Sequence, residues 1–220
     1  MKTTKAILII AGALLLLLNP LSSKADTVSY TVGIGNSDIS GYSPPYAEIL
    51  VNLTDSTHAT ITFTSDVVEG NIYLMGDGSA AAVNVNATSF TLGPVTGTNA
   101  GTGFSPGPYS QSSGNVDGFG TFNLAINSFD GFTDSADTIV FTLTDTSGSW
   151  GSASDVLTAD NKGFLAAAHI FVTSSPANGA NGALATGYAA NGTVPEPGIL
   201  ILLGIAMSAI GIAVPFARKI

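Results

Sequence analysis

The feature that most constrains this chain is a two-residue alternation of apolar and polar side chains through its middle. In segment 58–64, for example, Ala59, Ile61 and Phe63 alternate with threonines. Successive side chains of a β-strand point to opposite faces, so such a segment predicts a strand with one buried face. The other segments with this pattern are 27–34, 48–54, 122–126, 139–143 and 162–173, and more weakly 71–75, 82–86 and 89–92.

About eight or nine short strands, with no amphipathic helical period, predict an all-β fold. One apolar face per strand fits two packed antiparallel sheets, so we expect a β-sandwich of jelly-roll or Ig-like type over residues 26–173. Gly, Pro, Ser and Asn fill 93–118, which predicts a long surface loop or a hairpin insertion, and a short helical turn is expected near 155–159. Residues 174–193 predict a closing strand near 183–190 and a flexible stalk.

The segment between the two ends of the chain, residues 26–193, is strongly acidic. It holds fourteen of the fifteen Asp and Glu residues and one basic residue, Lys162, so its net charge is near −13. Such a surface repels phosphate backbones, which argues against nucleic-acid binding, and it keeps an exported protein soluble. The chain has no cysteine. Disulfides, thiolate metal sites and a cysteine nucleophile are therefore excluded, and the fold depends on its hydrophobic core.

Residues 1–25 predict a secretory signal peptide. Lys2 and Lys5 precede an uninterrupted apolar run, 6–18, and the small residues Ser23 and Ala25 form a cleavage signal. The apolar run has the length of a signal-peptide core and is short for a membrane span. We expect the secretion machinery to export the chain and cleavage to follow Ala25. An uncleaved anchor or a buried helix is the alternative.

Residues 194–220 form a second hydrophobic end with three parts. The tetrapeptide Val194, Pro195, Glu196 and Pro197 comes first, an uncharged apolar run follows at 198–217, and Arg218 and Lys219 come last. The run is long enough to predict a transmembrane helix, and the basic pair stays cytoplasmic, so the body faces outward. The prolines keep the tetrapeptide extended, in a form that a processing enzyme can bind. A plain single-span anchor is the alternative.

The ordered combination of tetrapeptide, apolar run and basic end resembles the PEP-CTERM sorting signal, a segment also catalogued as the C-terminal domain of ice-binding proteins. The resemblance implies a Gram-negative or similar host that makes exopolysaccharide. It also implies recognition by an exosortase, a membrane cysteine transpeptidase that would cut near Pro195, Glu196 and Pro197. The inner membrane would then hold the chain transiently, before transfer to the cell surface or extracellular matrix. A non-enzymatic role in a biofilm, with exopolysaccharide as a partner, follows from the resemblance alone.

Few residues of the body are candidates for catalysis or metal binding. His58 and His169 are the only histidines, and no Gly-x-Ser-x-Gly motif surrounds any serine, so the pattern gives little support to a hydrolase triad. Asp130, Asp134 and Asp137 offer the carboxylates that calcium prefers, but without the spacing of an EF-hand. We expect no catalytic residue and no cofactor, with calcium at these aspartates as the alternative.

Two further patterns leave a binding function open. A flat threonine face can order water and bind ice or sugar, although threonine is also common on ordinary solvated strands. The threonines that alternate are Thr60, Thr62 and Thr64, and Thr142, Thr144 and Thr146. Aromatic residues of the turn-rich segments can stack on sugar rings or cap the ends of the core. These are Tyr42, Tyr46, Phe104, Tyr109 and Trp150. A carbohydrate-, calcium- or ice-binding module is thus the alternative to a purely structural surface protein.

Overall fold

The alternating segments form strands, because each can bury one face against a core. In the computed structural model, which describes residues 26–129 and 131–192, β3 (His58–Ser65) buries Ala59, Ile61 and Phe63. A tight turn joins β3 to β2 (Ala47–Asp55). The Asp55 carboxylate caps this turn by accepting hydrogen bonds from the backbone N–H groups of Thr57 and His58, at 2.8 and 3.0 Å. Aspartate favours turns because its side chain can bond to the backbone in this way.

The remaining elements are short. The other strands are β1 (Asp26–Gly35), β4 (Val67–Val68), β5 (Asn71–Met75), β6 (Ala81–Val83), β7 (Phe90–Thr98), β8 (Ser110–Val116), β9 (Gly120–Asn127), β10 (Thr138–Asp145), β11 (Ala166–Ser174) and β12 (Ala185–Asn191). Short 3₁₀ turns occur at Ser37–Ile39, Phe132–Asp134, Ala153–Asp155 and Gly179–Asn181, and the third ends at the first residue of the helical turn expected at 155–159. No helix in the described part of the chain has the length and apolar character to span a bilayer.

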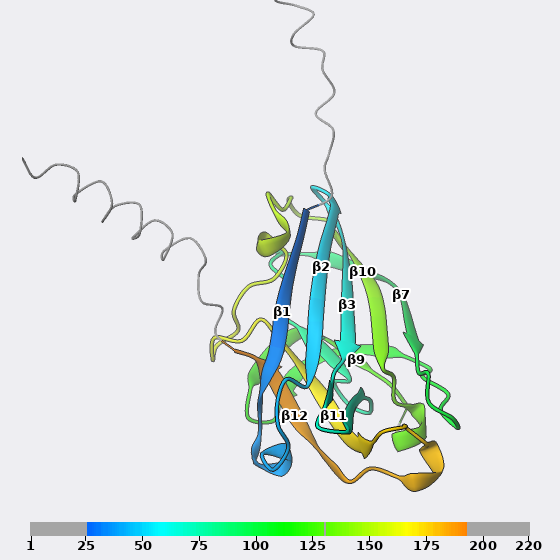
Figure 1. Ribbon diagram of the computed structural model, residues 1–220. Coiled ribbons are helices and arrows are strands. Elements are labelled where there is room, and N and C mark those ends of the chain that lie inside the picture. The colour runs from blue at the N-terminus through cyan, green and yellow to red at the C-terminus, as the bar shows by residue number, and fades with distance from the viewer. Residues whose placement is uncertain (1–25, 130, 193–220) are drawn as a thin grey trace, which may run out of the picture.

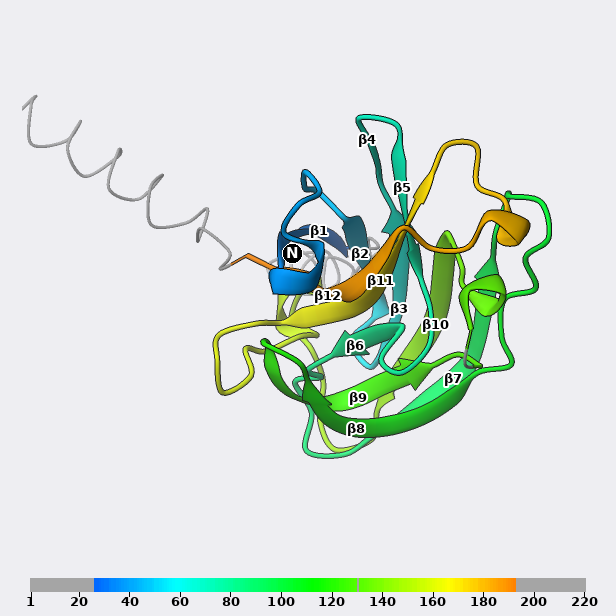
Figure 2. The ribbon, with the colours of Figure 1, turned by 90° about the horizontal axis from the view of Figure 1, so that it is seen from below.

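The strands belong to one antiparallel sheet. Its main path runs β7-β10-β3-β2-β1-β12-β11-β6-β9-β8, while β5 pairs with β11 and β4 pairs with β5. The sheet curls, so that the half containing β1, β2, β3, β10 and β7 faces the half containing β12, β11, β6, β9 and β8 (Figures 1 and 2). The register of β1 against β12 shifts between Val32 and Ile34, where one half gives way to the other, and such a bulge bends a strand. The predicted all-β antiparallel fold is confirmed.

The main apolar cluster joins inward side chains from both halves of the sheet. Phe63 and Phe141 stack with ring centroids 6.3 Å apart, and Leu124 and Ile170 of the other half belong to the same cluster. Each fully buried side chain of this size contributes about 1.5–3 kcal/mol. Two smaller clusters contain Phe122 and Phe171. The three clusters give residues 26–192 a hydrophobic core of their own, as an independently folding unit has.

Strand β11 departs from the alternating pattern, since its side chains are buried from Ala166 to Thr173. One face lies on the main cluster, and the other contacts the two smaller ones. The strand begins at Ala166 and not at Lys162, because Asp160 closes a turn ahead of it. The Asp160 carboxylate accepts hydrogen bonds from the N–H groups of Lys162 and Phe164, at 2.8 and 3.0 Å.

Segment 93–118 is neither one long loop nor a hairpin insertion. Its first residues continue β7 as far as Thr98, and its later residues form β8. The two strands pair with different partners, β7 with β10 and β8 with β9. Pro94 is tolerated in β7 because β7 is an edge strand, where a missing N–H need not interrupt a ladder.

The closing strand predicted near 183–190 is found as β12, which lies inside the sheet between β11 and β1. The residues ahead of it differ from the expected flexible stalk, because Asn178 forms a bridge with Thr102. Residues ahead of β12 therefore pack on the body. The predicted signal peptide with Ala25, residue Asp130, and the predicted sorting segment 194–220, with its transmembrane helix and with Arg218 and Lys219, lie outside the described residues.

Candidate functional site

The outer face of the half-sheet formed by β1, β2, β3, β10 and β7 is rich in hydroxyl groups. We call it the hydroxyl face. Each of these strands turns most of its apolar side chains inward, which leaves the alternate positions exposed or half-buried on the outside. The hydroxyl residues that β1, β3, β7 and β10 contribute at these positions are Thr27, Ser29, Thr31, Thr60, Thr62, Thr64, Thr91, Thr96, Thr98, Thr138, Thr142 and Thr144. Leu50 of β2 and Val140 of β10 are apolar residues of this outer face, and both pair with Thr62.

The antiparallel register aligns these side chains in rows across the strands. Thr60 of β3 pairs with Thr142 of β10, and Thr64 pairs with Thr138, which also pairs with Thr98 of β7. Neighbouring strands lie about 4.8 Å apart, and same-face residues along one strand lie about 6.8 Å apart. The hydroxyls of β3, β10 and β7 therefore form a two-dimensional array, and Glu48, Leu50 and Asn52 of β2 separate it from the hydroxyls of β1.

Most groups of this array are free to bind a ligand. Thr31 donates to Glu48 at 2.9 Å, and Thr98 donates to Asp137 at 3.2 Å. The other hydroxyls of the face have no hydrogen-bond partner among the described residues. Glu48 adds one carboxylate, which raises the pKa of nearby Asp66, although burial of Asp66 is the larger cause. Since a hydroxyl both donates and accepts, the array suits a hydroxylated ligand or ordered water.

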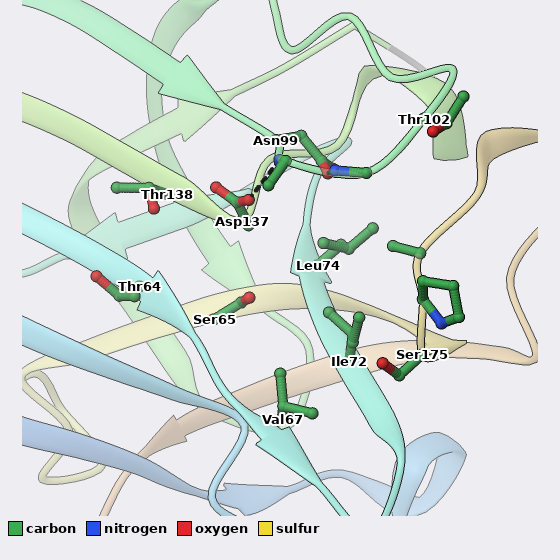
Figure 3. A pocket seen from close by; sticks show the side chains of 14 residues that line it. Thr64, Ser65, Val67, Ile72, Leu74, Asn99, Thr102, Asp137, Thr138 and Ser175 are labelled. Atoms are coloured by element: carbon green, nitrogen blue, oxygen red, sulfur yellow. Dashed lines mark hydrogen bonds between the residues drawn. The ribbon is translucent and has the colours of Figure 1, made fainter.

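A groove of about 500 Å³ opens at one end of the hydroxyl face, and we call it the end groove (Figure 3). Thr64 and Thr138 lie on its wall and so belong to both surfaces. Val67, Ile72 and Leu74 line its base, and the Val67 side chain is 61% exposed. The hydroxyl residues around it are Thr64, Ser65, Thr102, Thr138 and Ser175. Concave sites with apolar walls and a few polar groups are typical of small-ligand binding.

Two loops fix the shape of the end groove. The Asn99 side chain donates to the Ser135 carbonyl and accepts from the Gly101 N–H, both at 2.9 Å, and Asp137 accepts from the Ala100 N–H at 2.7 Å. The second loop meets the first at Gly179, where a Cβ would lie 2.5 Å from the Gly103 carbonyl oxygen. These contacts hold both loops that line the groove.

His169 is the buried histidine, and it lies on β11 with its ring stacked on that of Tyr188 of β12. Its Nδ1 lies 3.1 Å from the Gly76 carbonyl and its Nε2 lies 2.7 Å from the Thr186 hydroxyl. A carbonyl can only accept, so Nδ1 carries the proton and Thr186 donates to Nε2. The nearest carboxylate, Asp77, is 3.8 Å from Nδ1, which is beyond hydrogen-bond distance. Burial lowers the pKa of His169, against smaller raising effects of Asp77 and Gly76, so the ring is neutral at pH 7.

His58 lies in the exposed turn between β2 and β3. Its Nδ1 is 2.9 Å from the Asp55 carboxylate, and both side chains are more than half exposed. Hydrogen bonds from the Thr57 backbone and from His58 hold the pKa of Asp55 at about 2. The pair therefore stabilises a turn. Neither His58 nor His169 lies in a pocket with both a hydrogen-bonded carboxylate and a serine, which a hydrolase triad requires.

The aspartates considered for calcium are not brought together as a ligand set. Both oxygens of Asp137 already accept hydrogen bonds, from Thr98 and from Ala100. Asp134 lies in a 3₁₀ turn, and Asp130 is outside the described residues. Within 26–129 and 131–192, no three His, Cys, Asp or Glu side chains cluster so that they could share a metal ion.

The aromatic residues considered for sugar stacking mostly serve the core. Trp150 is 3% exposed and donates from Nε1 to the Asn86 carbonyl at 2.8 Å, and Tyr46 is 2% exposed. Phe104 packs edge-on against Phe132, while Tyr42 and Tyr109 are half-buried against the main cluster. The sequence pattern had marked the threonines of β3 and β10. It gave no signal for the end groove, because loops distant in the sequence form that groove.

Comparison with known proteins identifies no relative: no protein-family model, no curated protein and no solved structure matches this chain.

Proposed function

We propose that this chain is an exported, non-enzymatic surface or extracellular-matrix protein with a β-sandwich body, sorted by an exosortase through residues 194–220. One observation carries the proposal: the two sequence signals closely bracket the sheet. Strand β1 begins at Asp26, directly after Ala25, and Asp26 pairs with Leu53 and accepts a hydrogen bond from the Ala153 N–H at 2.8 Å. Strand β12 ends at Asn191, just ahead of Val194.

The environments of the two histidines support the non-enzymatic part of the proposal. The His169 ring is oriented by a backbone carbonyl where a triad would use a carboxylate, and His58 is in an exposed turn. In this reading the catalytic chemistry belongs to the exosortase, and residues 194–197 are its substrate.

The sorting proposal is tested in the host, with and without its exosortase, by the mass and location of the mature chain. We expect loss of the tail and departure from the inner membrane only when the exosortase is present. The double variant Pro195→Ala/Pro197→Ala should keep the tail, whereas Pro215→Ala, a proline change inside the apolar run, should be processed normally. A tail that stays unprocessed in the inner membrane of both strains would refute the proposal.

The hydroxyl face favours a second candidate function, which is binding of a neutral carbohydrate chain or of ice. The supporting observation is the cross-strand register, which aligns unpartnered hydroxyls such as Thr60 and Thr142 beside each other. The end groove adds an apolar surface with hydroxyls around it, of a kind that can pack against a sugar ring. The charge near −13 of the body disfavours anionic polysaccharides.

Residues 26–193 provide the test, in a glycan array and in an ice-affinity partition assay. The variant Thr60→Val/Thr142→Val keeps side-chain shape but removes two adjacent hydroxyls, and we expect about tenfold weaker binding because each hydrogen bond contributes about 0.5–1.5 kcal/mol. The control Thr121→Val removes an exposed hydroxyl from β9, in the other half of the sheet. Equal binding by Thr60→Val/Thr142→Val and by the control Thr121→Val would exclude carbohydrate or ice binding at the hydroxyl face. The absence of binding to any probe would exclude it as well.

A further inference from the structure

The main path of the curled sheet has two free ends, at β7 and β8, and they lie near each other. Along the main path β7 pairs only with β10 and β8 pairs only with β9. A cavity of about 560 Å³ is lined by Phe90, Thr91 and Leu92 of β7 together with Gln111, Ser112 and Ser113 of β8. Figure 2 shows both strands on the same side of the molecule. We call this opening the seam.

Neither strand of the seam carries a charged residue to protect its edge, although Pro94 and a register shift interrupt β7. Sheet edges are commonly blocked by charged residues, because their unpaired N–H and C=O groups can otherwise pair with another chain. Segments 90–98 and 110–116 contain no Asp, Glu, Lys or Arg, although the body around them has a net charge near −13. In β8, residues 110–113 are exposed on both faces. The seam is therefore a place where two acidic copies of this chain can approach without bringing like charges together.

Tyr109 leaves an unpaired polar group beside the seam. It precedes β8, and its ring lies so close to Gly97 of β7 that a Cβ at position 97 would overlap the hydroxyl. That hydroxyl is buried and has no hydrogen-bond partner among the described residues. The Tyr109 ring therefore joins β8 to β7 at this end of the seam, and the opening itself lies beside residues 90–92 and 111–113.

The directions of the strands define the partner. Each neighbouring pair along the main path is antiparallel, and the alternation makes β7 and β8 run in opposite senses. A twofold axis along the seam therefore places β7 of one copy beside β8 of the other as antiparallel neighbours, at both contacts. Closed twofold dimers are the commonest protein assemblies.

We propose that the seam is a self-association surface, at which two copies of this chain pair edge to edge, β7 of one with β8 of the other. The inference concerns residues 26–192 and is independent of how the tail is processed. Because the rest of the surface is acidic, the dimer should strengthen as salt screens the repulsion.

Sedimentation equilibrium of residues 26–193, at low and high NaCl, tests this proposal. We expect a dimer that strengthens with salt. The variants Thr96→Asp and Ser113→Asp should each weaken it by more than about tenfold, since they place like charges on the seam. The control Ser29→Asp adds the same charge to β1, away from the seam, and should leave the dimer in place. A wild-type monomer under all conditions, or dimers that persist in both seam variants, would overturn the proposal.

Cysteine cross-linking gives an answer even if a charged variant fails to fold. The chain has no native cysteine. Chains carrying Thr91→Cys mixed with chains carrying Ser113→Cys should form a heterodisulfide, whereas mixtures in which Ser29→Cys replaces either partner should not. Pairing of β7 with β8 would be rejected if the Thr91→Cys and Ser113→Cys mixture formed disulfides no faster than the mixtures with Ser29→Cys. It would also be rejected if only homodisulfides formed.

Discussion

His169 couples the stability of the sheet to pH. Burial keeps the pKa of this ring below its ordinary value of 6.5, so the unfolded chain binds more protons than the folded one between the two pKa values. The stabilising contribution is therefore fully present above about pH 6.5 and is lost as the pH falls toward the lower pKa of the folded state. Denaturant titrations at pH 7.5 and pH 5 should show lower stability at pH 5.

Replacement of His169 isolates this effect. His169→Gln should lower the free energy of unfolding at pH 7.5 by about 1–3 kcal/mol, because Gly76 and Thr186 lose a well-placed partner. It should also reduce the difference between pH 7.5 and pH 5. His58→Gln, at an exposed position, should change stability by no more than about 0.5 kcal/mol. An unchanged pH dependence in His169→Gln would show that other groups are responsible.

Asp55 should titrate far below an ordinary aspartate. Its pKa of about 2 arises because the ionised carboxylate accepts backbone hydrogen bonds in the β2–β3 turn. Since the folded pKa lies below the unfolded value of 3.8, the contribution is present above about pH 4 and is lost as the pH falls through about 2. A carboxyl NMR titration measures the pKa directly. Asp55→Ala should lower the melting temperature at pH 7 more than Asp117→Ala does, and equal effects would contradict the turn-capping role.

The contact between the two loops of the end groove depends on Gly179. A Cβ at this position would lie 2.5 Å from the Gly103 carbonyl oxygen, and neither backbone segment can move without disturbing the Thr102–Asn178 bridge. We expect Gly179→Ala to cost about 1–3 kcal/mol and to speed amide exchange in 99–104. Gly41→Ala meets no atom within 4 Å and serves as the control. Unchanged exchange in 99–104 would mean that the loops do not hold each other.

The strands differ in how well their sequences predict them. β2, β3 and β10 were predictable because each has one face on the core and one in solvent, which imposes the alternation. β8 carries Ser, Gln, Gly and Asn and is exposed on both faces over most of its length, so no apolar period marks it. β11 is buried on both faces, which also removes the alternation.

The candidate site was predictable only in its composition. The alternating threonines of β3 and β10 mark an outward face, but their alignment depends on the two strands being neighbours, although they are far apart in the sequence. The contributions of β1 and β7 depend on the same non-local pairing. The end groove requires the approach of residues 99–102 to 175–177, which no local pattern encodes.

The whole body should be stabilised by salt. One lysine and fourteen acidic residues give the segment 26–193 a net charge near −13, and a compact acidic chain repels itself more than an unfolded one does. Screening becomes strong once the Debye length falls to about 10 Å, near 0.1 M salt. The melting temperature of residues 26–193 should therefore rise with NaCl and then level off. A fall would mean that attractive charge pairs outweigh the repulsion.

A charge variant separates self-repulsion from the dimerisation proposed above. Asp117→Lys changes the net charge by about two units at an exposed site, and it should raise the melting temperature at low salt and reduce its dependence on NaCl. The neutral change Thr121→Ser should do neither. Dimerisation also makes the melting temperature depend on protein concentration, whereas self-repulsion within one copy does not. The part of the salt effect on the melting temperature that persists at the lowest protein concentrations and in Ser113→Asp therefore arises within a single chain. The part that vanishes under these conditions arises from dimerisation at the seam.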